Sequence, residues 1–422
     1  MPMAIRRNDA PRVLLTLLLI VCAAALAASF QFYREALVDT FFAFALASVL
    51  ILHFRVRPDW RDIPLVLVST AIFAAMDFRV LHYAPKIMAW VSFLGLSSYL
   101  IVAIRAIWAH GEERKILLYA WIPAVLFIIS EYFASDMLTW TAAAHPKTLD
   151  FFLLSFDCSL RVQWSFVAGQ AFARSPLLYT SSLIAYIGLA LPIALVYAGR
   201  LVRVKQRAFS AMLAFLITGP VGILFYNLFP ACGPHYLLGA SFPFHPFPVD
   251  LARKLILEPV AIQGPRNAMP SLHMAWMILA WQYSRGLSRW ERAIVLAFLA
   301  LTVIATLGTG EHWFADLIVA FPFALMIQAI CAYSLSWKDV SRLTAYFFGL
   351  LVTLVWLVTL RFTPDFFWMS PVIPWGLAAA TIALSIIRMS ELDRAVDRAS
   401  QAAVSRPSPF AAPVHEAPQT HV

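Results

Sequence analysis

The chain has 422 residues, of which 61% are hydrophobic and only 13% are charged, and its mean hydropathy is +0.76. A soluble domain of this size carries about twice that share of charged residues, so the composition excludes a soluble protein and predicts a polytopic integral membrane protein. The apolar runs are long and do not alternate with a period of two, which favours helices over an outer-membrane barrel. The predicted fold class is therefore all-α, a membrane helical bundle.

The formal net charge is +9, which in a soluble protein would indicate a polyanionic partner. In a membrane protein, Lys and Arg collect in cytoplasmic loops and set the orientation, so we expect no nucleic-acid partner. The four cysteines, Cys22, Cys158, Cys232 and Cys331, show no spacing typical of a zinc or redox site, and no metal is expected. Cys158 and Cys232 fall in loops on the same predicted side, which leaves a disulfide between them open.

Twelve segments have the length and apolarity needed to cross a hydrocarbon core of about 30 Å. The apolar run at the N-terminus continues past a stretch that resembles a signal-peptide cleavage site, which favours an uncleaved anchor. The predicted spans are residues 13–33, 39–54, 63–78, 87–109, 115–134, 176–198, 209–229, 274–284, 293–307, 312–333, 343–360 and 370–387.

The remaining segments predict how the chain is organised. Residues 157–172 are apolar on one side and polar on the other, which predicts a helix lying in the membrane interface. A Pro-rich loop covers residues 230–265, and the polar tail is expected to be a short amphipathic extension followed by disorder. We therefore expect N-terminal accessory helices (1–135), a catalytic core (136–335), C-terminal helices (336–388) and a polar tail (389–422).

The basic residues predict the orientation. If the N-terminus is cytoplasmic and there are twelve spans, most of the 32 Lys and Arg residues fall on the cytoplasmic side. This arrangement places both termini in the cytoplasm. In a bacterial inner membrane, the segments around residues 266–273 and 308–316 would then face the periplasm.

Those two segments hold the polar residues that point to chemistry. They lie at the ends of an apolar hairpin, residues 274–284 and 293–307, so two membrane-crossing arms would return both segments to the same side. His312 and Asp316 are four residues apart, so on a helix beginning near residue 311 they share one face. A carboxylate there would fix the imidazole tautomer and raise the basicity of a nucleophilic His312.

The first segment predicts the rest of the site. Pro270 before Ser271 suits a helix start, where backbone N–H groups favour a phosphate. His273 is then placed to act as a general acid. Arg266, Ser271 and Asn267 are the candidate phosphate-binding residues, although Arg266 is also explained as an interfacial anchor and Asn267 as a helix cap.

The string Pro270-Ser271-Leu272-His273, followed by His312-Trp313-Phe314-Ala315-Asp316, resembles the type 2 phosphatidic acid phosphatase superfamily. That family carries Pro-Ser-Gly-His and Ser-Arg-x5-His-x3-Asp motifs. The resemblance implies a six-helix phosphatase-like core and a metal-independent reaction that needs no cofactor. By resemblance, His312 is the nucleophile that becomes phosphohistidine, Asp316 is its partner, and His273 protonates the leaving group.

The chain departs from the family pattern at three places. Leu272 replaces the Gly of the second motif, Thr306 stands where the third motif has its Arg, and the first motif is absent. These departures remove expected phosphate ligands, and Arg266 is their substitute by position.

Two strings, residues 226–234 and 268–273, resemble the branch that contains inositol phosphorylceramide synthases. That resemblance implies transfer of a phospho-group from a lipid-linked phosphate ester to a lipid or sugar hydroxyl, with membrane lipids as partners. The alternative is a lipid phosphate or polyprenyl diphosphate phosphatase, for which water is the acceptor. Twelve spans are also typical of a transporter or flippase, but the polar residues gather at one interface and no internal repeat is visible.

Overall fold

The structure is a computed structural model, and it describes residues 10–56, 59–81, 86–203 and 205–404. Nearly all regular structure in these residues is helical. Two short strands, β1 (Lys147–Thr148) and β2 (Val260–Ala261), pair antiparallel and join the loop before α7 to the Pro-rich loop. The predicted all-α fold class is confirmed.

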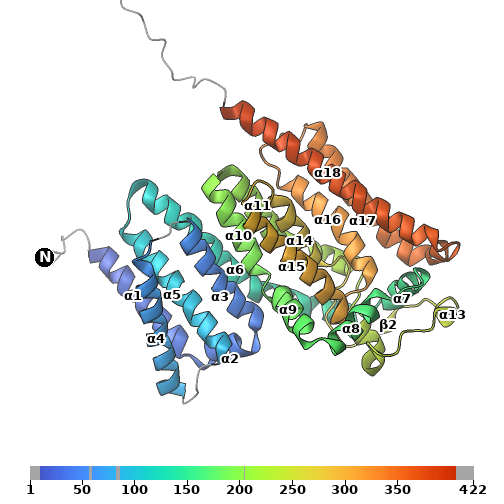
Figure 1. The fold of residues 1–422 in the computed structure, drawn as a ribbon, viewed down its shortest axis with the longest axis horizontal. Coiled ribbons are helices and arrows are strands. Elements are labelled where there is room, and N and C mark those ends of the chain that lie inside the picture. Colours follow the sequence, from blue (N-terminus) through green and yellow to red (C-terminus); the bar gives the residue numbers. More distant parts are fainter. Residues whose placement is uncertain (1–9, 57–58, 82–85, 204, 405–422) are drawn as a thin grey trace, which may run out of the picture.

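The N-terminal helices lie at one end of the molecule, and the C-terminal helices α17 and α18 lie at the other (Figure 1). The N-terminal unit contains α1 (Ala10–Ala28), α2 (Phe30–Val38), α3 (Thr40–Val56), α4 (Asp62–Leu81), α5 (Ile87–Trp108) and α6 (Gly111–Ala144). The middle contains α7 (Asp150–Ser159), α8 (Trp164–Arg174), α9 (Pro176–Ile187), α10 (Ala190–Arg203), α11 (Lys205–Leu228), α12 (Pro234–Leu238), α13 (Val249–Ala252), α14 (Leu272–Tyr283), α15 (Arg289–Gly308) and α16 (Phe314–Ile330). The far end contains α17 (Val340–Phe362) and α18 (Val372–Val404). Short 3₁₀ helices lie at Gly239–Ser241, between α12 and α13, and at Pro364–Trp368, between α17 and α18.

Seven helices in the described residues are long and apolar enough to cross a membrane, or up to nine if each of two bent helix pairs forms one span. Their outer faces are strongly apolar and exposed: only 11% of the α1 span and 28% of the α4 span are buried inside the protein. Such surfaces fit a hydrocarbon solvent, consistent with an integral membrane protein. A count of twelve spans and a six-helix core stay predictions. One predicted span, α14, has only 12 residues and measures roughly 18 Å.

Three expectations from the sequence need correction or limitation. The helix predicted at 157–172 is two helices, α7 and α8, because Arg161 takes a left-handed conformation (φ 63°) that ends the first one. All four cysteines are free, so Cys158 and Cys232 form no disulfide. Helix α18 continues to Val404 where a short extension was expected, and residues 405–422 of the tail lie outside the described residues.

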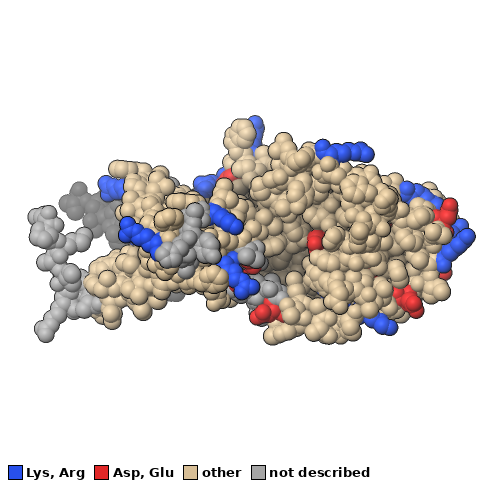
Figure 2. Space-filling view, turned by 90° about the horizontal axis from the view of Figure 1, so that it is seen from below, with Lys and Arg blue, Asp and Glu red and all other residues tan. Residues whose placement is uncertain are grey.

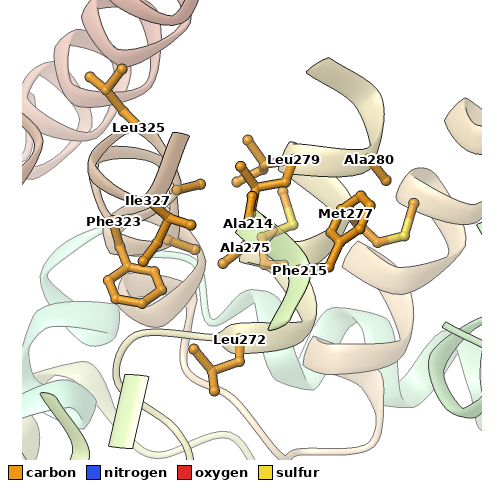
Figure 3. Packing of buried hydrophobic residues seen from close by; sticks show 14 of the residues in the cluster. Ala214, Phe215, Leu272, Ala275, Met277, Leu279, Ala280, Phe323, Leu325 and Ile327 are labelled. Atoms are coloured by element: carbon orange, nitrogen blue, oxygen red, sulfur yellow. The ribbon is translucent and has the colours of Figure 1, made fainter. Parts of the chain in front are cut away.

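Helix α14 lies at the centre of the buried core. Its side chains pack against α11 and α16, as Leu279, Phe215 and Ile327 illustrate in Figure 3. Ala275 and Ala280 are fully buried, and such small residues allow neighbouring helices to approach closely. A helix that is apolar on all sides is expected in this position. The consequence is that the first turn of α14, which contains His273, rests on a rigid support.

The N-terminal unit is joined to the middle of the protein by polar contacts. Arg55 on α3 donates from Nε and Nη2 to the Glu291 Oε1 atom on α15, at 3.0 and 2.9 Å. Arg203 on α10 pairs with the other oxygen of Glu291 at 3.5 Å. The Tyr197 hydroxyl donates to the Tyr119 carbonyl oxygen on α6 at 2.9 Å. These contacts fix the position of α3 and α6 against the central helices.

Inside the N-terminal unit, a buried polar network joins α3, α4 and α5. The imidazole of His53 contacts the Ser98 hydroxyl through Nδ1 at 2.7 Å and the Asp62 carboxylate through Nε2 at 2.9 Å. Arg105 pairs with the second oxygen of Asp62 and also with Asp59. Because His53 and Asp62 are only 2% and 0% exposed, each needs the other to satisfy its polar atoms.

The substitution Asp62→Ala is therefore expected to destabilise the protein. It removes the buried partner of both His53 and Arg105, and breaking a buried ion pair costs about 3–5 kcal/mol. Thermal unfolding of the detergent-purified protein measures the effect. Asp59→Ala is the control, because Asp59 shares Arg105 but stands in contact with solvent, and its loss should lower the unfolding midpoint far less. Equal effects of the two substitutions would contradict a buried network.

Candidate active site

The two polar segments come together at one end of α14 and α16. His273 lies in the first turn of α14, and His312 lies in the loop between α15 and α16. Their ring centroids are 6.4 Å apart, with the ring planes at 64° to each other. The structure thus brings together two histidines that are far apart in the chain.

The contacts of His312 favour one tautomer. Its Nδ1 atom lies 3.1 Å from the Ala268 carbonyl oxygen and 3.4 Å from the Asp316 Oδ2 atom, both of which are acceptors. Its Nε2 atom lies 3.3 Å from the Ser271 hydroxyl, which already accepts the Met274 N–H as the N-cap of α14. A proton on Nδ1 satisfies these contacts and leaves the Nε2 lone pair directed at Ser271.

The contact between His312 and Asp316 arises differently from the prediction. Helix α16 begins at Phe314, so His312 precedes the helix and does not share a helical face with Asp316. Asp316 reaches back to the loop, because its Oδ2 atom accepts the Trp313 N–H at 2.7 Å. Its carbonyl oxygen also accepts the Ser271 N–H at 3.2 Å. Asp316 therefore joins the starts of α14 and α16 as well as contacting the imidazole.

A second carboxylate, Asp150 at the start of α7, holds the Pro-rich loop against this site. It is 0% exposed and accepts the Cys232 N–H at 3.0 Å, the Gly233 N–H at 2.8 Å and the Trp313 Nε1–H at 2.8 Å. Gly233 has a φ of 134°, and a Cβ atom there would lie 2.5 Å from the Glu311 carbonyl oxygen. The loop can approach the residue before His312 this closely only with glycine at that position.

Two further residues of the α7–α8 segment support the loop around His312. The Asp157 Oδ2 atom accepts the Phe314 N–H at 3.0 Å, and the Ser165 hydroxyl donates to the His312 carbonyl oxygen at 3.1 Å. Burial raises the pKa of Asp150, and it raises the pKa of Asp157 to about 8. The sequence reasoning did not assign Asp150, Asp157 or Ser165 to the site. Two carboxylates in an otherwise apolar segment were the available signal, because buried charges are costly unless they serve a purpose.

Of the three candidate phosphate-binding residues, Ser271 contacts His312, and the other two, Arg266 and Asn267, have different surroundings. Arg266 is 3% exposed, and its guanidinium donates to the carbonyl oxygens of His145 (2.8 Å), Pro146 (3.0 Å) and Gly264 and to the Cys232 sulfur (3.5 Å). These bonds use most of the five N–H donors of an arginine. Asn267 lines the adjoining cavity, and its Oδ1 atom has no hydrogen-bond partner among the described residues.

A cavity of about 520 Å³ adjoins His273. The imidazole of His273 stacks on the Tyr186 ring, with a centroid distance of 3.8 Å, and both side chains line the cavity. The described residues of the lining include the carboxylates Asp39 and Glu311 and no Lys or Arg. Seen from the end where α2, α8 and α9 lie, the molecule is hollowed in its middle, and an acidic side chain lies at the edge of the hollow (Figure 2).

A resident metal has no evident set of ligands in the described part of the chain. No group of three or more His, Cys, Asp and Glu side chains is arranged there to hold an ion. The carboxylates closest to the histidines are engaged by backbone N–H groups, as shown for Asp150 and Asp316. The expectation of a metal-independent reaction stays a prediction.

The pKa of Asp157 predicts a dependence of stability on pH. Between about pH 4 and pH 8, the folded protein holds a proton on Asp157 that the unfolded chain has lost, so stability falls as the pH rises through this window. Asp157→Asn keeps a neutral acceptor for the Phe314 N–H and removes that titration. We expect the variant to lose less thermal stability than the parent between about pH 6 and about pH 9. An identical pH dependence in the two proteins would contradict the assignment.

Residues 152–330 match a family model described as the PAP2 superfamily. The matched segment contains both histidines and makes up less than half of the chain. No curated protein and no solved structure matches the chain. The match supports the resemblance of this segment to the type 2 phosphatidic acid phosphatase superfamily and, with the apolar helices, a membrane enzyme of the phosphatase type.

Proposed function

We propose that the protein cleaves a lipid-linked phosphate ester through a phosphohistidine on His312 and passes the phospho-group to a lipid or sugar hydroxyl. The observation that carries the proposal is the approach of the two histidine rings, with His273 lining an apolar cavity and the Nδ1 atom of His312 within reach of two acceptors. From the distribution of basic residues we further propose that the site faces the periplasm and that both termini are cytoplasmic.

In the first half-reaction, the Nε2 lone pair of His312 attacks phosphorus and forms a P–N bond. The P–O bond to the leaving group breaks, its electron pair moves to the departing oxygen, and His273 gives that oxygen a proton. Asp316, 3.4 Å from Nδ1, stabilises the positive charge that develops on the imidazole as the new bond forms. Ser271 is placed to donate to a phosphate oxygen once the ester lies against Nε2.

In the second half-reaction, the hydroxyl of an acceptor attacks phosphorus and the P–N bond breaks. The electron pair returns to Nε2, and the acceptor's proton goes to His273, which restores both histidines. His312 is only 1% exposed, and the cavity that His273 lines is mainly apolar. Restricted access of water favours an organic acceptor over hydrolysis, which is why we prefer a transferase to the simple phosphatase that remains the alternative.

The charge of the transferring phosphate needs donors, because the cavity lining offers no Lys or Arg among its described residues. We propose Ser271 and Asn267 for this role, since an amide can turn its NH₂ group toward the cavity. Arg266 can contribute to phosphate binding only through the one N–H group that is not already donated to the surrounding loops. The backbone N–H groups at the start of α14 add a favourable dipole.

The roles of the two histidines are tested with two substrates. His312→Ala should lower turnover of every phosphate ester by about 10⁴-fold or more, because it removes the nucleophile. His273→Ala should lower turnover of a lipid phosphate by about 10²–10⁴-fold but have little effect on p-nitrophenyl phosphate, whose leaving group needs no proton. Product analysis with labelled phosphatidic acid and ceramide then separates a new phospho-lipid from free phosphate.

Either product is informative in that experiment. A new lipid that depends on His312, formed without free phosphate, supports the transferase, and free phosphate alone makes the enzyme a phosphatase. Unchanged turnover in His312→Ala would rule out His312 as the nucleophile and, with it, the proposed mechanism. An equal loss of turnover on both substrates in His273→Ala would rule out His273 as the general acid.

The phosphate-binding residues are separated by comparing activity with stability. Asn267→Ala should lower kcat/KM by about tenfold, because it removes one hydrogen bond to a charged group. It should not lower the thermal unfolding midpoint. Arg266→Lys should lower the midpoint, because a single ammonium cannot replace the guanidinium contacts with three carbonyl oxygens. If Arg266→Lys instead keeps its stability and loses kcat/KM, Arg266 is primarily a phosphate ligand.

A further inference from the structure

The cavity beside His273 is not formed by the central helices alone. Phe41 and Ala45 on α3 and Phe127, Ser130 and Leu138 on α6 are part of its lining. All five precede residue 152, where the match to the PAP2 superfamily begins. The opposite side of the cavity comes from α9, α10, α11 and α14. The N-terminal unit therefore completes a cavity that the matched segment would leave open on one side.

This part of the lining is held in a fixed position. The Arg55–Glu291 contact joins α3 to α15, and the Tyr197–Tyr119 contact joins α10 to α6. Close to the histidine, the Phe41 ring lies 6.0 Å from the His273 ring, measured between centroids. The N-terminal side thus begins directly at the candidate general acid and continues away from it along α3 and α6.

The chemistry of this side indicates what it contacts. With Asp39, which directly precedes α3, this side contributes six lining residues, and four of them have apolar side chains. The other two, Asp39 and Ser130, offer no positive charge to a phosphate. The cavity volume of about 520 Å³ lies in the range of about 300–1,000 Å³ that is typical of small-molecule sites. An apolar space of this size next to His273 matches a hydrocarbon chain.

We propose that α3 and α6 form the wall that selects the hydrocarbon part of the lipid phosphate, with Ala45 and Phe127 setting the room available. This inference rests on the proposed function for the identity of the phosphate ester. It assigns a role to the N-terminal unit: the central helices carry out the chemistry, and the N-terminal unit determines which chains fit beside them.

Two substitutions that change the cavity volume in opposite directions test the wall. Ala45→Phe fills the cavity and should lower kcat/KM for a sixteen-carbon phosphatidic acid by about tenfold relative to an eight-carbon one. Phe127→Ala enlarges the cavity and should shift the same ratio toward the longer chain. Leu117→Ala is the matched control, because Leu117 is also buried on α6 (2% exposed) but does not line the cavity. Its ratio should stay that of the parent. A ratio that moves equally in Leu117→Ala and Phe127→Ala, or in neither, overturns the proposal.

A binding measurement separates this inference from the reaction. In the His312→Ala protein, a phosphatidic acid with a photoreactive diazirine at the chain end should label α3 and α6, and an excess of unlabelled phosphatidic acid should suppress that labelling. Labelling of the lipid-facing helices α1 and α4 should not be suppressed. Suppressible labelling, together with no activity of the parent protein on any phosphate ester, would uphold the wall and reject the phosphate transfer. Activity with no suppressible labelling of α3 or α6 would reject the wall alone.

Discussion

The hydrogen bonds that Asp150 accepts are the constraint on which the candidate site depends. A single buried carboxylate takes the N–H groups of Cys232 and Gly233 and the indole N–H of Trp313. These groups belong to two loops that are far apart in the chain and would otherwise be free to move independently. Asp157, about two helical turns further along α7, makes a similar contact by accepting the Phe314 N–H. Together these two loops define the position of His312.

The site also illustrates a division between rigid and adjustable parts. The ring nitrogens of His312 contact Ala268 in the loop, Ser271 at the start of α14 and Asp316 on α16, an arrangement that suits the proposed role of a nucleophile with one fixed tautomer. His273 has a different environment, because its ring stacks on Tyr186 and lies near Phe41 and Trp276. Stacking fixes the plane of a ring but leaves its nitrogen atoms free for a substrate, which suits a residue that exchanges protons with changing partners.

Sequence reasoning recovered the features that depend on local pattern. The apolar runs gave the all-α class and the positions of most helices, and the spacing of polar residues led to His273 and His312, whose rings the structure brings together. It did not recover long-range pairing. Nothing in the spacing of residues indicates that Asp150 meets Trp313 or that Arg266 bonds to carbonyl groups more than a hundred positions away. The helical relation assumed for His312 and Asp316 was wrong in its geometry, because the helix begins after His312.

The short central helix has a consequence for how the protein is made. With 12 residues, α14 is too short to cross a hydrocarbon core of about 30 Å as an independent segment. Its apolar surface is almost wholly covered by α11, α15 and α16, so its final position exists only when those helices are present. Helix α14 can therefore reach its final position only after α15 and α16, which follow it in the chain, have been made. Insertion of the histidine-bearing hairpin is then a joint event of three helices, completed only after the chain has been made to about residue 330.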